Sequence, residues 1–324
     1  MEKERSPRPV GERNTEQKEL GHDTSVRITF LRHSQKEPGK VADGGRRGIT
    51  TKGVIRAKNV GEKIFRGRNI KMAYGTKVDR TAATLQAAFE GAGVTGMDKK
   101  ILQTKDGMNA FFDLPHPGFD AESEKKMNLE MDEYVRAQYP GHPGKTYRQL
   151  VEEGVLSADD QEEIEERFQE KYVQWYLDLV GEQPTPDRSL PRQDAASVAY
   201  KINRLINLPD HMKKGESVDL VSSGHKYSTE GFLKYCIERE VNGKKVVGFN
   251  RLEDIGGSMK VLDGWDLVIS NDASGKKNIK LVIRRENGEE KEYGLNVEMV
   301  SKLAGEYMQD KNITQKRIDF PILR

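Results

Sequence analysis

The sequence predicts an α/β protein, in which a mostly parallel sheet lies in a three-layer sandwich between helices. The first observation is that short apolar runs typical of buried strands occur at 26–31, 70–74 and 218–222. The second is that each run is followed by a segment whose apolar residues recur at helical spacing. Strands that alternate with helices in this way favour a parallel sheet with helices on its faces.

A third observation concerns the C-terminal part, where the strands come without helices between them. The segments 265–270, 276–285 and 291–296 read as strands, and Asn-Asp and Asn-Gly turn signals separate them. A helix around 297–308 follows. We therefore expect antiparallel strands near the C-terminus, in addition to the parallel strands.

Helical spacing supports each predicted helix in turn. Thr50 or Thr51 can cap a helix after the first strand, and a second helix is expected after the strand 70–74. The long stretch 120–190 reads as mostly helical, and its aromatic residues at helical spacing favour a packed core over a platform for stacking bases. The apolar residues of these three segments are Val54, Ala57, Val60 and Ile64, then Ala82, Leu85 and Phe89, then Ile164, Phe168, Tyr172, Trp175 and Leu179.

Length and composition bound the domain organisation. The chain has 324 residues, enough to bury a proper core. Residues 1–24 are polar and charged, and we expect a disordered tail there. We assign 25–324 to one domain, with 120–190 as a helical cap or insertion and 245–324 as the C-terminal strands and helix.

The charge balance excludes several classes of protein. The net charge is only +2, which does not favour binding to nucleic acid or to an anionic membrane. No apolar run approaches the roughly 20 residues that span a bilayer, and the first residues lack a secretory signal. The one cysteine, Cys236, excludes an internal disulfide framework. We expect a cytoplasmic protein.

Basic and imidazole side chains follow three of the predicted strands. Arg32 and His33 come after the first strand, Arg80 opens the helix after the second, and His225 follows the strand 218–222. Ligands of open α/β sheets bind at the carboxyl ends of the strands. Taken singly, each of these residues is most simply explained as an exposed side chain without a functional role. Together they suit a phosphate, since arginine presents a planar fork of donors and neutral imidazole can act as a nucleophile.

Four segments in order resemble the histidine phosphatase (phosphoglycerate mutase-like) superfamily. FLRHSQ at 30–35 resembles the strand with the family's Arg-His-Gly motif, with Ser34 in place of glycine. ITTKGVIRAKNVGEKI at 49–64 is similar to the family's next helix. AYGTKVDRTAATLQAA at 73–88 resembles the element that carries the second arginine, and DLVSSGHKYS at 219–228 the strand before the second histidine. The resemblance covers roughly residues 26–240.

The resemblance implies a mechanism. His33 would attack phosphorus in line and become a phosphohistidine, which water then hydrolyses. Arg32, Arg80 and His225 would hold the phosphoryl oxygens. Asp113, with Gly118, Phe119 and Asp120 behind it, matches the family's acid best; Asp120, Glu122 and Glu124 are the alternatives. Neither a metal nor another cofactor is expected.

The sequence departs from the family's pattern at three places. Ser34 would either crowd the phosphate or give it a further hydroxyl donor. Asp79 stands beside Arg80 and could compete for its guanidinium group. The turn before Arg80 reads Gly75-Thr76-Lys77 where the family often has Ser-Ser-Pro.

Other motifs predict less. GHPGKT at 141–146 lacks the first glycine and the preceding strand of a phosphate-binding loop, and it reads as a turn. His116 and His142 each precede a proline and lack the paired spacing of zinc ligands. Arg46 and Arg47 lie in a glycine-rich loop; they could reach an anionic substrate or be a solvated basic loop.

The sequence therefore predicts a metal-independent phosphomonoesterase that acts on a phosphorylated small molecule or a phosphoprotein. A phosphoglycerate mutase-like phosphotransferase is the alternative enzyme, although Ser-Gln-Lys follows His33 where glycolytic mutases have Gly-Gln-Ser. A non-catalytic module that binds phospholigands or proteins on the same fold is the third hypothesis. Substrate identity and oligomeric state are not predicted.

Overall fold

A computed structural model describes residues 20–37, 48–76, 78–95, 101–103, 121–179 and 190–311. Its strands are β1 (Thr24–Arg32), β2 (Ile70–Gly75), β3 (Ile101–Gln103), β4 (Ser217–Gly224), β5 (Ile237–Val241), β6 (Lys244–Val247), β7 (Gly264–Asn271), β8 (Lys277–Arg284) and β9 (Glu290–Leu295). Its α-helices are α1 (Thr51–Phe65), α2 (Asp79–Gly91), α3 (Ala121–Gln138), α4 (Tyr147–Glu152), α5 (Ala158–Leu177), α6 (Pro191–Ile206), α7 (Lys226–Cys236) and α8 (Val297–Asp310).

The described strands form one sheet in the order β3-β2-β4-β1-β7-β8-β9-β5-β6. Strands β3, β2, β4 and β1 pair in parallel, whereas β7 pairs antiparallel with β1 and all later pairs are antiparallel. The predicted α/β class is confirmed. The sheet is mixed rather than mostly parallel, because short turns join β7 to β8 and β8 to β9, and a short turn joins only antiparallel strands.

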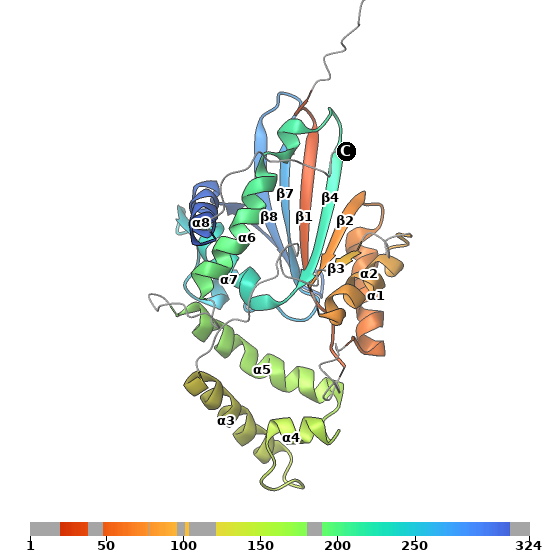
Figure 1. Cartoon of the computed structure of the whole chain (residues 1–324), viewed down its shortest axis with the longest axis vertical. Helices are drawn as coiled ribbons and strands as arrows, with labels where there is room; N and C mark the ends of the chain where they lie inside the picture. The colour runs from red at the N-terminus through yellow and green to blue at the C-terminus, as the bar shows by residue number, and fades with distance from the viewer. Residues whose placement is uncertain are drawn as a thin grey trace, which may run out of the picture.

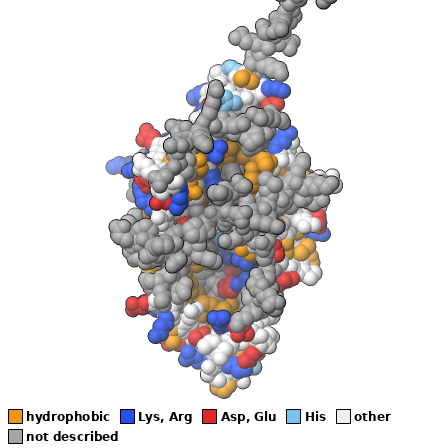
Figure 2. Space-filling model, viewed as in Figure 1, with side chains coloured by type: hydrophobic (Ala, Val, Ile, Leu, Met, Phe, Trp, Pro, Cys, Tyr) orange, Lys and Arg blue, Asp and Glu red, His pale blue; other side chains and the backbone are white. Residues whose placement is uncertain are grey.

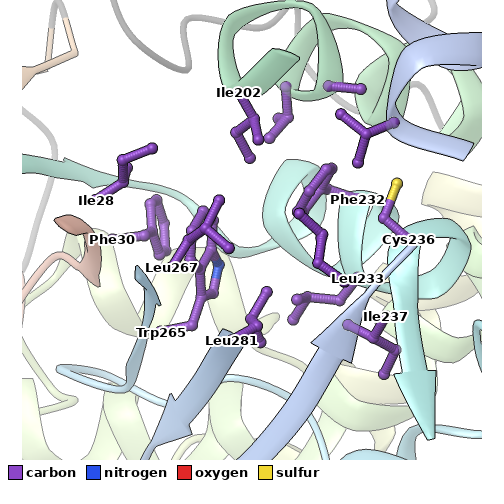
Figure 3. Close-up of a cluster of buried hydrophobic side chains, with 14 of the residues drawn as sticks. Ile28, Phe30, Ile202, Phe232, Leu233, Cys236, Ile237, Trp265, Leu267 and Leu281 are labelled. Atoms are coloured by element: carbon purple, nitrogen blue, oxygen red, sulfur yellow. The ribbon is translucent and has the colours of Figure 1, made fainter. Parts of the chain in front are cut away.

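Helices cover the two faces of the sheet unequally (Figure 1). One face packs against α6, α7 and α8, and this is where the larger core lies. Phe30 and Trp265 stack with their ring centroids 5.8 Å apart, and Phe232 of α7 stacks on the same indole ring at 5.9 Å. Figure 3 shows these strand residues facing Ile202 and Phe232 of the helical layer.

The other face carries α1 and α2 over its parallel half. Leu31 and Val221 of the strands pack with Ala57, Val60 and Leu85 of the two helices. The helices approach each other closely at two glycines. A Cβ atom at Gly61 would lie 1.9 Å from the carbonyl oxygen of Ala88, and one at Gly91 would lie 2.0 Å from that of Lys58. These positions therefore require glycine.

The stretch predicted as mostly helical contains α3, α4 and α5, which lie together below the sheet in Figure 1. They have a small core of their own, built from Val135, Leu150, Leu156 and Ile164 among others. Ser157 caps α5 in a reciprocal capping box with Asp160. Figure 2 shows side chains of both charge signs interspersed at this end of the molecule.

Two details differ from the sequence-based expectations. Leu20–Asp23 precede β1 in a defined arrangement, in which Leu20 forms a bridge with Lys213 and the backbone N–H of Gly21 donates to Met212 O. Residues 20–24 of the predicted tail are therefore ordered, and residues 1–19 lie outside the described ranges. The hairpin of β5 and β6 was not predicted. Its turn is Asn242-Gly243, with φ angles of 52° and 73°.

No helix within the described ranges combines the length and the apolar composition needed to cross a membrane.

Candidate active site

The carboxyl ends of β1, β4 and β2 lie side by side and place the predicted site residues. Arg32 is the last residue of β1 and stands opposite Gly224 of β4. His33 and His225 each follow directly after their strand. Arg80 lies in the first turn of α2, just after β2. The structure therefore brings Arg32, His33, Arg80 and His225 to one edge of the sheet.

His33 is buried, at 8% exposure, and one ring nitrogen is fixed. Its Nδ1 lies 2.8 Å from the carbonyl oxygen of Ser34. A carbonyl oxygen can only accept a hydrogen bond, so Nδ1 carries the proton and donates it. In the neutral ring, Nε2 then holds the lone pair. This is the tautomer that a nucleophilic imidazole requires.

Burial holds the pKa of His33 well below its ordinary value of 6.5, and the nearby charges of His225, Arg80 and Arg32 lower it further. Both causes disfavour the protonated ring. His33 is consequently neutral at neutral pH, with its lone pair available for bond formation.

The ring of His225 contacts His33, and Arg80 contacts His225. The rings of His33 and His225 meet edge to face, with centroids 5.1 Å apart. Arg80 Nη2 lies 3.5 Å from His225 Nδ1, a long contact in which only the guanidinium group can donate. His225 also directly precedes α7, so the N-terminal end of that helix points toward the same place. Basic side chains and a helix N-terminus together favour an anion there.

Arg32 is fixed in orientation by two neutral oxygens. Its Nη1 donates to Met259 O at 2.6 Å and to Gln169 Oε1 at 3.2 Å. Burial lowers the pKa of its guanidinium group, while the charge of the buried Glu230 is the largest effect in the opposite direction. Glu230 Oε1 also accepts from the Met259 N–H at 2.6 Å. Glu230 thus holds the backbone that orients Arg32 and favours its positive charge.

The Ser34 side chain is hydrogen-bonded within the protein. The side chain is fully buried and its Oγ donates to the carbonyl oxygen of Gly53 in α1, at 2.8 Å. Its backbone N–H donates to Thr84 Oγ1 at 2.9 Å, and that hydroxyl donates to Arg80 O. The segment after β1 is therefore tied to both α1 and α2.

The turn before Arg80 is held by threonines. The backbone N–H of Thr76 donates to Thr81 Oγ1 at 2.9 Å, and Thr81 Oγ1 donates to Val78 O at 2.7 Å. Asp79 lies in the first turn of α2, where a negative charge is favourable near the helix N-terminus. Lys77 lies outside the described residues.

Helix α5 contributes polar residues that the sequence analysis did not identify. A small cavity of about 30 Å³ lies beside Arg32 and His33, and Glu162, Glu165, Glu166 and Gln169 line it from α5. Glu162 pairs with Arg56, and Glu165 pairs with Lys36. Glu166 has no such partner among the described residues. Burial raises the pKa of its carboxyl group, as does the charge of Glu162.

The predicted acid Asp113 lies outside the described residues, as do its alternative Asp120, the histidine His116 and the loop arginines Arg46 and Arg47. Glu122 is an exposed residue of α3, and the Glu124 side chain is not among those described. His142 lies in the turn between α3 and α4. The buried thiol of Cys236 belongs to the larger core, where burial raises its pKa.

Among the described residues, no three His, Cys, Asp or Glu side chains gather in a way that could hold a metal ion. Catalysis without a metal stays a prediction.

No family model and no curated protein matches the sequence of this chain. Solved structures do match it. A mycobacterial glucosyl-3-phosphoglycerate phosphatase is 14% identical, covering 79% of this chain and 97% of its own, with a TM-score of 0.40. Phytase from Hafnia alvei is 10% identical, covering 89% and 97%, with a TM-score of 0.41. Phosphoglycerate mutase from Bacillus anthracis is 13% identical, covering 87% and 98%, with a TM-score of 0.42.

Proposed function

We propose that this chain is a phosphomonoesterase of the histidine phosphatase type, which forms a phosphohistidine on His33. The observation that carries the proposal is the arrangement of His33. Its Nδ1 donates to Ser34 O, its pKa is lowered, and the His225 ring and Arg80 lie next to it. A neutral imidazole with a defined lone pair, surrounded by cationic and donor groups, suits attack on a phosphate ester.

The reaction proceeds in two steps. In the first, His33 Nε2 bonds to phosphorus, the bond from phosphorus to the ester oxygen breaks, and an acid protonates the leaving alcohol. In the second, the oxygen of water bonds to phosphorus, the bond from phosphorus to His33 Nε2 breaks and returns its electron pair to the ring, the water gives a proton to the conjugate base of that acid, and inorganic phosphate leaves. Arg32, Arg80 and His225 hold the phosphoryl oxygens in both steps, and the in-line geometry places the leaving oxygen opposite His33.

Asp113 is the residue we assign as the acid, on the resemblance of its sequence context. A variant Asp113→Asn should slow esters with poor leaving groups much more than p-nitrophenyl phosphate, whose leaving oxygen needs no proton. Glu166→Gln is the matched comparison, because Glu166 is the carboxyl without a partner among those described beside His33. A leaving-group effect confined to Glu166→Gln would move the assignment to α5.

The decisive experiment measures phosphate release from p-nitrophenyl phosphate in EDTA. We expect the full chain to release phosphate and His33→Ala to lose at least about 1,000-fold in rate. His142→Ala is the control, because this histidine lies in the turn between α3 and α4. Rapid quenching in alkaline detergent with a ³²P-labelled ester should trap a phosphoprotein that is stable to alkali and labile to acid, and only when His33 is present.

The alternatives give different outcomes. Transfer of the label to a second alcohol in preference to water would indicate the phosphotransferase. Binding of phosphate esters without release, by the unmodified chain and for a panel of natural esters, would indicate the non-catalytic module. Full activity of His33→Ala would contradict the phosphohistidine mechanism itself.

A further inference from the structure

One face of α5 changes in chemistry along the length of the helix. Spacings of three, four and seven residues place side chains on the same face, and they relate Asp159, Glu162, Gln169, Val173 and Tyr176. Val173 and Tyr176, near the C-terminal end, belong to the larger core. Asp159 and Glu162, near the N-terminal end, instead contact the segment after β1 and helix α1 through polar groups. The two ends of α5 are therefore held by different interactions.

Two of the polar contacts at the N-terminal end are ion pairs open to solvent. Lys52 pairs with Asp159 at 2.9 Å, and both side chains are more than half exposed. Lys36 pairs with Glu165 at 2.5 Å, and about a third of each side chain is exposed. Ion pairs between exposed side chains contribute little to stability. These two pairs alone therefore do not fix the end of α5.

Gln35, two residues after the proposed nucleophile, makes a buried contact with the same end of α5. It is 3% exposed. Its Nε2 donates to Asp159 Oδ1 at 2.8 Å and to Glu162 Oε2 at 2.6 Å. An amide nitrogen has two N–H donors, so both are used on carboxylates of α5. Hydrogen bonds to charged groups are stronger than those between neutral groups.

The oxygen of the same amide is held by helix α1. Gln35 Oε1 accepts from Thr50 Oγ1 at 2.6 Å, and Thr50 caps α1 by accepting from the backbone N–H of Gly53. The hydroxyl thus uses its lone pair on the helix and its proton on the amide. The orientation of the Gln35 amide follows, with its oxygen toward a donor and its nitrogen toward two acceptors.

The charges around this amide explain why the residue is a glutamine. Asp159 and Glu162 face it from α5, and Lys52 and Arg56 of α1 donate to the same two carboxylates. The hydrogen bonds from Lys52 and Gln35 hold the pKa of Asp159 below its ordinary value, so its carboxyl group is charged at neutral pH and only accepts. A glutamate in place of Gln35 would accept from the threonine hydroxyl equally well but would have no donor for α5.

The position of α5 matters to the site through Gln169. This residue lies roughly two turns beyond Glu162, between the polar and the apolar ends of the face. Its Oε1 accepts from Arg32 Nη1 at 3.2 Å and is one of the two neutral oxygens that orient the guanidinium group. A shift of the N-terminal end of α5 would therefore weaken the hold on Arg32.

We propose that Gln35 is a positioning residue: by donating to Asp159 and Glu162 it holds α5 over the site and keeps Gln169 in contact with Arg32. The effect on catalysis rests on the proposed function, whereas the effect on α5 does not.

The first test is amide hydrogen exchange in the full chain. In Gln35→Glu, three carboxylates lie together, so exchange at residues 158–168 should become about tenfold faster or more at neutral pH, while residues 172–177 stay within about twofold. Gln86→Glu is the matched control, because it makes the same change beside the carboxylate of Glu90 at an exposed position of α2. Unchanged exchange at 158–168, or equal acceleration at both ends of α5, would overturn the proposal.

A swap of donor and acceptor sharpens this test. In the double variant Gln35→Glu, Asp159→Asn, the new amide donates to the new carboxylate, and the number of negative charges is that of the unmodified chain. Exchange at 158–168 should return to within about threefold of the unmodified chain. Asp159→Asn alone should have little effect, because its amide oxygen still accepts. A double variant that does not recover contradicts the pairing, even if Gln35→Glu itself fails to fold.

The catalytic effect is measured as the pH profile of kcat/KM for p-nitrophenyl phosphate. Gln35→Glu should lose about tenfold relative to the unmodified chain at about pH 8, and the ratio should approach one near about pH 5, because a protonated carboxyl group again offers a donor. The basic residues of this contact region, Lys36, Lys52 and Arg56, stay charged throughout. A loss that does not vary with pH would indicate a general structural defect and would overturn the positioning role.

Failure of this inference can be told apart from failure of the proposed function. Hydrogen exchange needs no turnover, so it decides the position of α5 even if no ester is hydrolysed. Hydrolysis that depends on His33, with unchanged exchange in Gln35→Glu, overturns only the inference. Faster exchange at 158–168 in Gln35→Glu, with no hydrolysis by the unmodified chain, supports the hold on α5 and contradicts only the proposed function.

Discussion

Two groups of charged side chains lie on the same sheet and are built differently. The first, which comprises Arg32, His33, Arg80 and His225, lies at the carboxyl ends of the parallel strands. The second lies on a face of the sheet around Asp266 of β7. Asp266 accepts from Thr29 Oγ1 at 2.6 Å and pairs with Arg284 at 3.2 Å and with Arg68 at 3.4 Å.

The difference lies in what balances the positive charge. In the second group, the arginines share a carboxylate, as buried charges normally do. In the first, the hydrogen bonds of Arg32 go to neutral oxygens, and the pKa of His33 is lowered by burial and by neighbouring positive charge. Arg32 still senses the charge of Glu230, but its hydrogen bonds to the described residues do not go to a carboxylate, and such an arrangement is suited to an incoming anion. Strand direction explains the location, since only parallel strands bring successive carboxyl ends to one edge.

The largest expected effect is on activity, at the first group. Arg80→Met should lower kcat/KM for p-nitrophenyl phosphate roughly 100-fold or more, because it removes a donor from the transition state. Its effect on the free energy of unfolding should be small, because Arg80 is only partly buried. A variant that lost stability but kept its activity would contradict the distinction drawn between the two groups of charged side chains.

The second group should behave in the opposite way. Arg284 is 7% exposed, so Arg284→Met removes a buried partner of Asp266 and should lower the free energy of unfolding by about 2–3 kcal/mol, somewhat less than a fully orphaned charge because Arg68 remains. Urea unfolding gives the stability, and kcat/KM should be retained at temperatures where the variant is folded. A loss of kcat/KM in the fully folded variant would show that the two groups are coupled.

A third prediction concerns acid. The folded-state pKa of His33 is well below 6.5, so the unfolded chain takes up a proton at this residue before the folded chain does. Stability from this residue should therefore fall as the pH drops below about 6.5, by up to about 1.4 kcal/mol per pH unit. His33→Asn should lose less stability than the unmodified chain between about pH 7 and pH 5, and His142→Asn should not differ from it. Parallel curves for all three proteins would exclude the effect.

The smallest expected effect is at Ser34. Ser34→Gly removes the hydrogen bond to Gly53 O and adds backbone freedom, and it should cost about 1–2 kcal/mol of stability. Activity should stay within about twofold, because the hydroxyl faces α1. Steady-state kinetics beside urea unfolding checks both. A loss of more than tenfold in kcat/KM would mean that the hydroxyl reaches the phosphate after all.

The sequence allowed the central strands and their ends to be predicted, because apolar runs and the residues that follow them are local patterns. Arg32, His33, Arg80 and His225 were found in this way. The antiparallel extension was predicted in β7, β8 and β9. The β5–β6 hairpin was missed although Val241-Asn242-Gly243-Lys244 carries the turn signal.

The contribution of α5 could not be predicted in the same way. The spacing of its apolar residues correctly indicated a helix with one packed side. The element that its polar side contacts is determined by the tertiary structure, which residue spacing does not reveal. Gln169 directly follows Phe168, one of the aromatic residues at helical spacing in this segment. It contacts Arg32, which lies 137 residues earlier in the chain. For the acid, the described residues do not include Asp113, so its assignment rests on the resemblance alone.

Arg56 links α1 to both α5 and the segment that follows β8. Its guanidinium group reaches Glu162 on α5 with one nitrogen and Glu286 beyond β8 with two others. Because the guanidinium group is planar and rigid, it fixes the distance between α5 and the segment after β8. The helix that contributes Gln169 to Arg32 is thus held in place by a covalently rigid link as well as by packing. In Arg56→Lys a single ammonium group replaces the fork, and amide hydrogen exchange in α5 should become faster.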